Sequence, residues 1–322
     1  MKSILVSEPG GPEKLVLADV ADPSSGEGEI LVSVAAAGLN FIDTYQRGGL
    51  YPMDFPFTPG LEGAGSILEV GAGVHGVEQG ETIAWTNVLG SYAGKHVIPA
   101  EKAIPVPSKI DPLIAAALPL QGITAHYLAS DTFPLTEGDR CVIHAGAGGV
   151  GLLLTQVAKM RGAEVFTTVG SEEKAELSRG AGADHVILYE ETDFKEEVEK
   201  IAGANAIDVV YDGVGAATFT KGLDLLRPRG LMVIFGSASG LAPDVSPLVL
   251  MAKGSLFVTR PTMGDYLLTR EELLSRTTDL FDWVLKGKLD VRIGAEFALA
   301  DAADAHRALE GRKTTGKVLI RP

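Results

Sequence analysis

The stretch Cys141-Val142-Ile143-His144-Ala145-Gly146-Ala147-Gly148-Gly149-Val150-Gly151 joins an apolar run directly to a glycine-rich turn. Beyond the turn, apolar side chains recur at i, i+3, i+4 and i+7 from Val150 to Ala158, which predicts a helix with one buried face. A strand, a glycine turn and a helix in this order direct free backbone N–H groups and the positive helix end at a phosphate. The spacing Ala145-x-x-Gly148-x-x-Gly151 is a variant of the dinucleotide-binding fingerprint.

The chain changes character along its length. Up to about residue 122 it is β-rich, with predicted strands at 30–36 and 66–70 separated by Gly/Pro turns. From there to about residue 260, strands alternate with helices such as 194–202, and the predicted strands are 140–144, 164–169, 185–188, 207–211, 231–235 and 255–259. This alternation predicts an α/β fold with a doubly wound parallel sheet. Two helices (270–286 and 302–310) and a strand (317–320) follow.

Composition limits the possible partners and compartments. The 322 residues are enough for two domains, and the net charge of −14 argues against a nucleic acid as the main ligand. No run approaches the ~20 apolar residues of a membrane span, and the N-terminal apolar run is too short for a secretory signal. The single cysteine, Cys141, lies in an apolar strand, which indicates a buried core residue. We therefore expect a cytoplasmic protein without membrane or nucleic-acid partners.

The end of the second strand of the alternating region indicates which nicotinamide cofactor fits. NAD-specific sites usually carry Asp or Glu there, about 20 residues after the glycines, to bind the ribose 2′-hydroxyl. This chain instead reads Thr167-Thr168-Val169-Gly170-Ser171-Glu172-Glu173-Lys174. Ser171 and Lys174 suit a 2′-phosphate, whereas the two glutamates are typical of a solvent-facing helix start. We expect NADPH, the alternative being that Lys174 is an ordinary surface lysine.

Four blocks of sequence resemble the medium-chain dehydrogenase/reductase superfamily, and more closely its zinc-free quinone oxidoreductase branch, which includes zeta-crystallin. They are residues 40–52, 138–159, 209–212 and 311–317, and the resemblance covers essentially the whole chain. Val142, where the family more often has Leu, is a conservative departure. The resemblance implies a β-rich, GroES-like catalytic domain and a Rossmann NADPH-binding domain, with the active site in the cleft between them.

The domain boundaries follow from the change in pattern. We assign residues 1–122, completed by 291–322, to the GroES-like domain, and residues 123–290 to the Rossmann domain. The apolar strand from Ser255 to Thr259 is expected to be the last of its sheet, and edge strands invite pairing with another chain. The resemblance implies a dimer joined there, so we expect a homodimer.

Zinc divides this superfamily, and the sequence argues against it here. Where the family's metal-binding His stands in a Gly-His-Glu motif, this chain has Leu61. The six histidines show no ligand spacing, and His144 is better interpreted as a packing or hydrogen-bonding residue. Without a Lewis acid, alcohol oxidation is disfavoured, but reduction of an electrophilic acceptor needs only a hydride and correct positioning.

The resemblance also implies where the cofactor binds. The nicotinamide is expected near the 41–43 segment, the pyrophosphate on the glycine turn, and the 2′-phosphate near Gly170 to Lys174. For Asp43 the alternative is a structural role, accepting backbone hydrogen bonds. The expected cofactor-binding residues are Phe41, Ile42, Asp43, Tyr127, Gly148, Gly149, Val150, Gly151, Gly170, Ser171, Lys174, Tyr189, Phe235, Ser237, Phe257, Thr259 and Arg312.

Three polar residues of the 40–52 segment are candidates for orienting the substrate carbonyl by hydrogen bonding: Asn40, Tyr45 and Tyr51. The alternatives are a turn residue for Asn40 and half-buried packing for the tyrosines. The proton that completes the reduction is expected from Tyr45 or from water.

The sequence therefore predicts an NADPH-dependent, zinc-independent quinone reductase. Two alternatives stay open. An alkenal or enone reductase shares the cofactor and differs only in its acceptor. A non-catalytic nucleotide- or RNA-binding relative is the alternative from another class, although no basic, aromatic-interleaved segment favours RNA.

Overall fold

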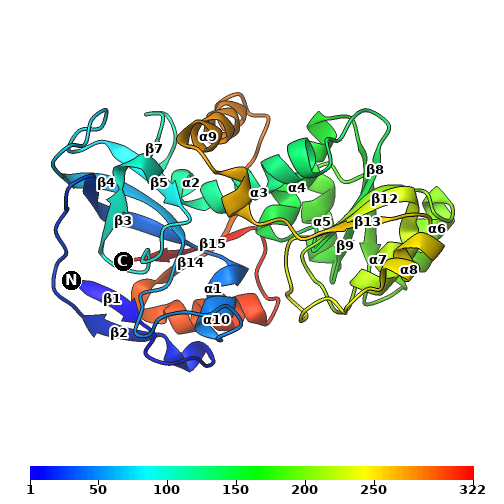
Figure 1. Cartoon of the computed structure of the whole chain (residues 1–322), viewed down its shortest axis with the longest axis horizontal. Coiled ribbons are helices and arrows are strands. Elements are labelled where there is room, and N and C mark those ends of the chain that lie inside the picture. The colour runs from blue at the N-terminus through cyan, green and yellow to red at the C-terminus, as the bar shows by residue number, and fades with distance from the viewer. The chain divides into compact units, whose positions relative to one another are not determined.

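The strand that runs into the glycine turn lies inside a six-stranded parallel sheet of the computed structural model, which describes residues 1–322. The strand order is β10-β9-β8-β11-β12-β13, the 3-2-1-4-5-6 order of dinucleotide-binding folds. Figure 1 labels β8, β9, β12 and β13 of this sheet. The strands are β8 (Arg140–His144), β9 (Glu164–Val169), β10 (His185–Leu188), β11 (Ile207–Asp212), β12 (Leu226–Ile234) and β13 (Phe257–Thr259). Four of these have bounds within one residue of the predicted ones; β12 starts earlier and β13 is shorter.

Helices connect these strands and pack against them. They are α4 (Gly149–Met160), α5 (Glu172–Gly180), α6 (Phe194–Ala202), α7 (Phe219–Leu225) and α8 (Pro247–Ala252). A buried apolar cluster built around Val142, Phe166, Val210 and Met232 fills the space between sheet and helices. The alternating pattern therefore produces the predicted doubly wound α/β sheet.

The rest of the chain forms mainly antiparallel sheets. The larger has the order β14-β15-β3-β4-β5-β7, with β6 also paired to β3, and β1 pairs with β2. Its strands are β3 (Glu29–Leu39), β4 (Glu62–Val70), β5 (Thr82–Thr86), β6 (Lys95–Pro99), β7 (Ile104–Pro105), β14 (Ile293–Ala298) and β15 (Lys317–Arg321), and the small sheet has β1 (Lys2–Leu5) and β2 (Val16–Asp19). The helices of this part are α1 (Phe41–Arg47), α2 (Pro112–Ala117), α3 (Pro119–Tyr127), α9 (Arg270–Leu285) and α10 (Ala302–Glu310).

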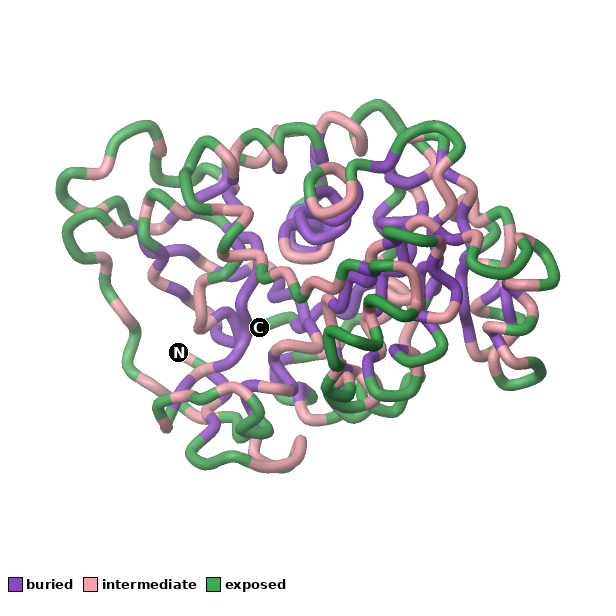
Figure 2. The backbone as a smooth tube through the Cα atoms, turned by 45° about the vertical axis from the view of Figure 1, so that its right-hand side comes forward, coloured by how far each residue is buried: buried purple, intermediate pink, exposed green.

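The chain divides into two compact units. Unit 1 comprises Met1–Ile123, Leu267–Gly287 and Val291–Pro322, and unit 2 comprises Thr124–Tyr266 and Lys288–Asp290. Figure 2 shows buried residues gathered in the interior and exposed residues along the outer turns of the chain. The C-terminal strand β15 pairs with β3, so the end of the chain belongs to unit 1.

One segment joins a different unit from the one expected. The sequence assigns residues 123–290 to the Rossmann domain, but α9 packs within unit 1. Arg270 at its start donates to the carbonyl oxygens of Ala100 and Ala103, and Leu280 lies against Gly122. Helical periodicity gives the buried face of α9 but not the partner that covers it. No helix is long and apolar enough to cross a membrane.

Candidate functional site

The glycine turn of unit 2 has the geometry that the fingerprint predicts. Ala145 adopts a left-handed conformation with φ 56°, and the Gly148 N–H donates to its carbonyl at 2.9 Å. Helix α4 then begins at Gly149, with Gly148 as its N-cap. A Cβ on Gly151 would lie 2.3 Å from the Ala145 carbonyl oxygen, so only glycine lets the helix approach the turn this closely. The first N–H groups of α4 are the place where the fingerprint predicts a phosphate, and this contact stays a prediction.

Most of the predicted cofactor residues of unit 2 follow the carboxyl ends of its strands. Gly170 follows β9, Tyr189 follows β10, Phe235 follows β12, and Thr259 ends β13. In a parallel sheet these ends share one edge, and ligands of doubly wound folds bind in the crevice outside that edge. Residues far apart in the sequence thus lie along the same edge of the sheet as the glycine turn.

The end of β9 carries no carboxylate. Ser171 caps α5 by accepting from the Lys174 backbone N–H, and the Tyr189 hydroxyl lies directly over Gly170. Glu172 forms an ion pair at 2.5 Å with Arg179, which lies further along the same helix. One of the two glutamates at the start of α5 is therefore paired within its own helix.

The other predicted residues of unit 2 differ in their surroundings. The ring of Tyr127 stacks on Tyr266 with centroids 4.1 Å apart, just before a π-helical turn at Leu128–Thr132. Ser237 accepts a hydrogen bond from Arg260 at 3.2 Å. Phe257 is 60% exposed on the edge strand β13. His144 is buried, bonded to the Thr168 hydroxyl and packed edge-on against Phe194, in agreement with the predicted packing role.

In unit 1 the 40–52 segment contains the short helix α1, which has two different faces. Asp43, Thr44, Gln46 and Arg47 are buried, whereas the residues at 41, 42 and 45 are half-buried. The rings of Phe41 and Tyr45 lie 5.7 Å apart, and Tyr51 meets Tyr45 edge-on at 5.6 Å. The predicted residues thus divide into an aromatic face and a buried polar face.

Asn40 lies at the centre of a buried polar network. Its amide nitrogen donates to Glu62 Oε1 at 2.8 Å and to the Gly38 carbonyl at 3.1 Å. Its amide oxygen accepts from Lys317 Nζ at 2.9 Å and from Gln121 Nε2 at 3.2 Å. Lys317 also forms an ion pair with Glu62, whose other oxygen accepts from the Leu120 N–H at 2.7 Å. Burial lowers the pKa of Lys317 to about 7.

A second buried chain of hydrogen bonds begins at Asp43. Its Oδ2 accepts from the Asn40 N–H and from the Tyr92 hydroxyl, both at 2.9 Å. The Tyr92 hydroxyl also contacts His306 Nε2 at 3.2 Å, and Arg47 lies 2.9 Å from His306 Nδ1. Because a guanidinium only donates, Nδ1 accepts and Nε2 carries the proton. His306 is thus neutral, which agrees with its pKa, lowered to about 3 by burial and by Arg47.

This chain of donors ends on the Asp43 carboxyl group. Asp43 is fully buried, and burial raises its pKa to about 6 against the opposing effect of its two donors. Its Oδ1 has no partner in the protein. The position of Asp43 on the buried face of α1 favours the structural alternative, and its cofactor contact stays a prediction.

Sequence reasoning missed most of these buried partners. Glu62 and Lys317 stand in segments that the sequence singles out, but 255 residues separate them. Tyr92 and His306 are 214 residues apart and carry no motif. Only the pairing of β15 with β3 brings Lys317 to Asn40, and spacing along the chain does not reveal such a pairing.

Comparison with known proteins adds a second line of argument. Residues 26–108 match the alcohol dehydrogenase GroES-like domain, and residues 149–276 match the zinc-binding dehydrogenase family. The chain is 42% identical to a quinone oxidoreductase of Pseudomonas aeruginosa, covering 100% of this chain and 99% of the relative. The chain belongs to the quinone oxidoreductase branch of the medium-chain dehydrogenase/reductase superfamily.

Two further proteins are similar to this chain over almost all of its length. The Escherichia coli quinone oxidoreductase, solved in complex with NADPH, shares the fold with a TM-score of 0.97 at 40% identity, each chain covered completely. A 2-haloacrylate reductase from Burkholderia is 39% identical over 99% of this chain and 98% of its own length.

The residues of this chain do not suit a zinc ion, although the family that matches residues 149–276 is described as zinc-binding. Leu61, at the position of the family's metal-binding His, is apolar and buried. No group of three or more His, Cys, Asp or Glu side chains is arranged to hold a metal ion. Cys141 is buried inside the parallel sheet. We therefore derive no catalytic step through a metal.

Proposed function

We propose that this protein is an NADPH-dependent quinone reductase that works without zinc. The observation that carries the proposal is the full-length similarity to quinone oxidoreductases at 42% identity. The reaction converts quinone, NADPH and one proton into hydroquinone and NADP⁺. Bound NADPH supplies the hydride, so the protein binds and orients the two reactants and excludes competing reactions.

Unit 2 is proposed to hold the cofactor at the carboxyl edge of its parallel sheet. The N–H groups at the start of α4 bind the pyrophosphate, and Ser171 and Lys174 bind the 2′-phosphate. Phe235 and Ser237, which follow β12, and Phe257 and Thr259 of β13 are proposed to contact the rest of the cofactor. Arg312 belongs to unit 1, and its proposed contact with the 2′-phosphate rests on the family resemblance alone.

The assignment of NADPH is tested by Lys174→Ala, with Lys200→Ala on the neighbouring helix α6 as the control. Lys174→Ala is expected to weaken NADPH binding by about tenfold or more and to leave NADH binding within about twofold, because only NADPH has a phosphate at this position. Lys200 is exposed and pairs with Glu197, so its replacement is expected to change neither. Equal losses for both cofactors would show that Lys174 is only a surface residue.

Unit 1 is proposed to bind the acceptor at the aromatic face of α1. Phe41, Tyr45 and Tyr51 offer half-buried rings against which a planar quinone can stack. The hydroxyl groups of Tyr45 and Tyr51 are proposed to orient the quinone oxygen, and Tyr45 or water to supply the proton. Asn40 takes part through α1, as argued below.

The 2-haloacrylate reductase relative makes an electron-poor alkene the second candidate acceptor. A haloacrylate carries a carboxylate, which needs a nearby cation. Arg47, the one basic residue of the 40–52 segment, is buried and pairs with Glu310 at 2.6 Å. The segment therefore suits a neutral quinone or enone better than an anion.

Acceptor choice is settled by steady-state NADPH oxidation with matched concentrations of 1,4-benzoquinone, 9,10-phenanthrenequinone, a 2-alkenal and 2-chloroacrylate. The quinones are expected to give kcat/KM values at least about tenfold above the others, which corresponds to about 1.4 kcal/mol of transition-state stabilisation. Turnover of the alkenal or the chloroacrylate alone would contradict the quinone assignment.

We also propose a homodimer joined through the edge strand β13. This strand has no neighbour on its outer side, and three large apolar side chains on or near it are exposed: Phe257 (60%), Leu248 (69%) and Met251 (64%). Exposed apolar edge strands of this kind favour pairing with a second copy. Sedimentation analysis of Leu248→Glu/Met251→Glu is expected to show monomers where the wild type shows dimers. A wild-type monomer would contradict the proposal.

A reducing compartment such as the cytoplasm fits the cysteine content. Cys141 is the only cysteine, it is buried, and burial raises the pKa of its thiol. A single cysteine cannot form a disulfide within the chain, so an oxidising compartment would not stabilise the fold in that way. Fractionation of the source cells is the direct test.

A further inference from the structure

The side chain of Asn40 has no hydrogen-bonding capacity left for an acceptor. An amide offers two N–H donors and two acceptor lone pairs. The donors are taken by Glu62 and the Gly38 carbonyl, and the lone pairs by Lys317 and Gln121. Asn40 is also 3% exposed. To reach a quinone oxygen, its amide would have to give up a buried partner, which would leave that partner unsatisfied.

The partners of Asn40 are as tightly enclosed as Asn40 itself. The side chains of Lys317 and Glu62 are 1% and 0% exposed, so the rest of unit 1 covers both of them. A Cβ added at Gly38 would lie 2.3 Å from Glu62 Oε1 and 2.6 Å from Lys317 Cε. The backbone of β3 therefore packs closely against the ion pair, and the network has little room to rearrange.

This network holds the first turn of α1. Asn40 is the N-cap residue, and its backbone N–H donates to Asp43 Oδ2 at 2.9 Å. The Asn40 side chain forms a capping box with Asp43. It also binds Glu62 of β4, Gln121 of α3 and Lys317 of β15. The start of α1 is therefore fixed to three other elements of unit 1. The half-buried residues Phe41 and Tyr45 lie one and five residues beyond this anchor.

We propose that Asn40 is a positioning residue, which Lys317 and Glu62 hold in place and which sets the aromatic face of α1 without touching the acceptor. The inference rests on the proposed quinone reduction. A displacement of about 1 Å at a reacting group lowers turnover by about a hundredfold, so the anchor matters for catalysis even without a direct contact.

The test is a double-mutant cycle of Asn40→Ala and Lys317→Met, with Lys95→Met as the matched control. Lys95 lies in the same unit and pairs with Asp22 at the surface. Each network variant is expected to lower kcat/KM for the quinone by about ten- to hundredfold, and the double variant by at most about threefold more, because both changes release the same anchor. The Lys95→Met rates are expected to stay within about twofold of the wild type, because Lys95 is not part of the network.

A charge-swapping pair separates positioning from direct contact more sharply. Asn40→Asp places a second carboxylate beside Glu62, whereas Asn40→Asp with Glu62→Gln again leaves one carboxylate beside Lys317. The pair is expected to recover about tenfold of the activity lost by Asn40→Asp alone. An amide that acts by donating to the acceptor would not be rescued by a change at the buried Glu62.

Hydrogen exchange of the α1 amides provides a readout that does not depend on turnover. Faster exchange over α1 is expected in Asn40→Ala and Lys317→Met but not in Lys95→Met, since only the first two release the helix. Gln121→Met, which removes one uncharged donor, gives a milder version should Lys317→Met not fold. Wild-type protein inactive with every quinone would refute the proposed function, while the exchange data would still test the anchor. Additive losses dominated by Asn40→Ala, with α1 exchange unchanged, would overturn the inference.

Discussion

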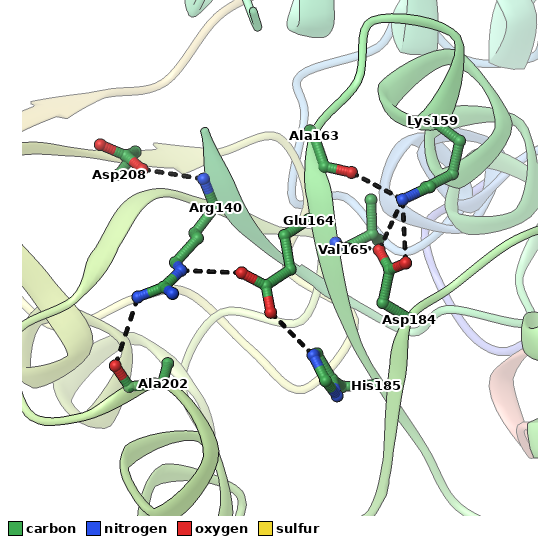
Figure 3. Close-up of polar contacts among 9 residues, drawn as sticks. All are labelled: Arg140, Lys159, Ala163, Glu164, Val165, Asp184, His185, Ala202 and Asp208. Atoms are coloured by element: carbon green, nitrogen blue, oxygen red, sulfur yellow. Dashed lines mark hydrogen bonds and ion pairs between the residues drawn. The ribbon is translucent and has the colours of Figure 1, made fainter. Parts of the chain in front are cut away.

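The two units each contain an array of acidic, basic and histidine side chains, but the arrays differ in burial. In unit 1, Lys317 and Glu62 have 1% and 0% side-chain exposure and sit beside Asn40. In unit 2, Arg140, Glu164 and His185 begin neighbouring strands, and Arg140 and Glu164 are 39% and 35% exposed (Figure 3). Asp208 and Arg227 extend this row across β11 and β12.

The location of each array matches its proposed role. The row in unit 2 lies at the amino ends of the parallel strands, which is the edge opposite the proposed cofactor site. There its partly exposed side chains form ion pairs with one another. The network in unit 1 lies directly behind the helix proposed to bind the acceptor. Exposed ion pairs contribute little because water and salt screen them, whereas a buried charge that loses its partner is costly. Burial thus predicts which array tolerates change.

The largest difference is expected for loss of a buried cation. Lys317→Met leaves the Glu62 carboxylate uncompensated and is expected to lower the free energy of unfolding of unit 1 by about 3–5 kcal/mol. Both tryptophans, Trp85 and Trp283, lie in unit 1, so their fluorescence in urea titrations reports this unit. Adding Glu62→Gln is expected to recover part of the loss, because no unpaired charge is left. A loss below about 1 kcal/mol would mean that the pair is solvated like a surface pair.

A smaller effect is expected in the pH dependence. Because the pKa of buried His306 is lowered to about 3, the unfolded chain takes up a proton below about pH 6.5 while the native state does not. This costs the native state about 2 kcal/mol between pH 7 and pH 5. Asp43 opposes the trend, since its pKa is raised to about 6 and the native state binds a proton first.

Urea titrations of His306→Gln at pH 7 and pH 5 isolate the histidine contribution. Relative to the wild type, the variant is expected to gain about 2 kcal/mol on going from pH 7 to pH 5. The carboxylates of unit 2 affect the free energy of unfolding at lower pH. The pKa of Glu164 is lowered despite partial burial, by His185 and Arg140, so its contribution is lost only as the pH falls toward acid. If the free energy of unfolding of His306→Gln changed between pH 7 and pH 5 as much as that of the wild type, His306 would have to take up its proton in the native state as it does in the unfolded chain.

The smallest effect is expected at the half-exposed row. Arg140→Met removes the 2.8 Å contact with Glu164 but leaves His185 as a partner of that carboxylate. The expected loss is below about 1 kcal/mol and shrinks further in 0.5 M salt, because exposed pairs are screened. Circular dichroism monitors unit 2, which has no tryptophan. A loss comparable to that of Lys317→Met would remove the distinction between the two arrays.

Local patterns predicted unit 2 better than unit 1. The bounds of β8, β9, β10 and α6 agree with the predicted ranges because periodicity and glycine turns act within a few residues. The cofactor residues proposed at the ends of the parallel strands came from the family resemblance, and the sheet topology places these strand ends at one edge. The network around Asn40 was not predictable in this way. Lys317 reaches Asn40 through sheet pairing across most of the chain, and burial alone decides that its charge matters.

Quinone-dependent oxidation of NADPH by the purified protein, before and after exhaustive chelation of metal ions, tests the central claim most directly. The account predicts one NADPH consumed per quinone reduced, a rate proportional to protein concentration, and the same rate after chelation. No NADPH oxidation above the protein-free blank would contradict it, and so would activity that disappears on chelation and returns with zinc.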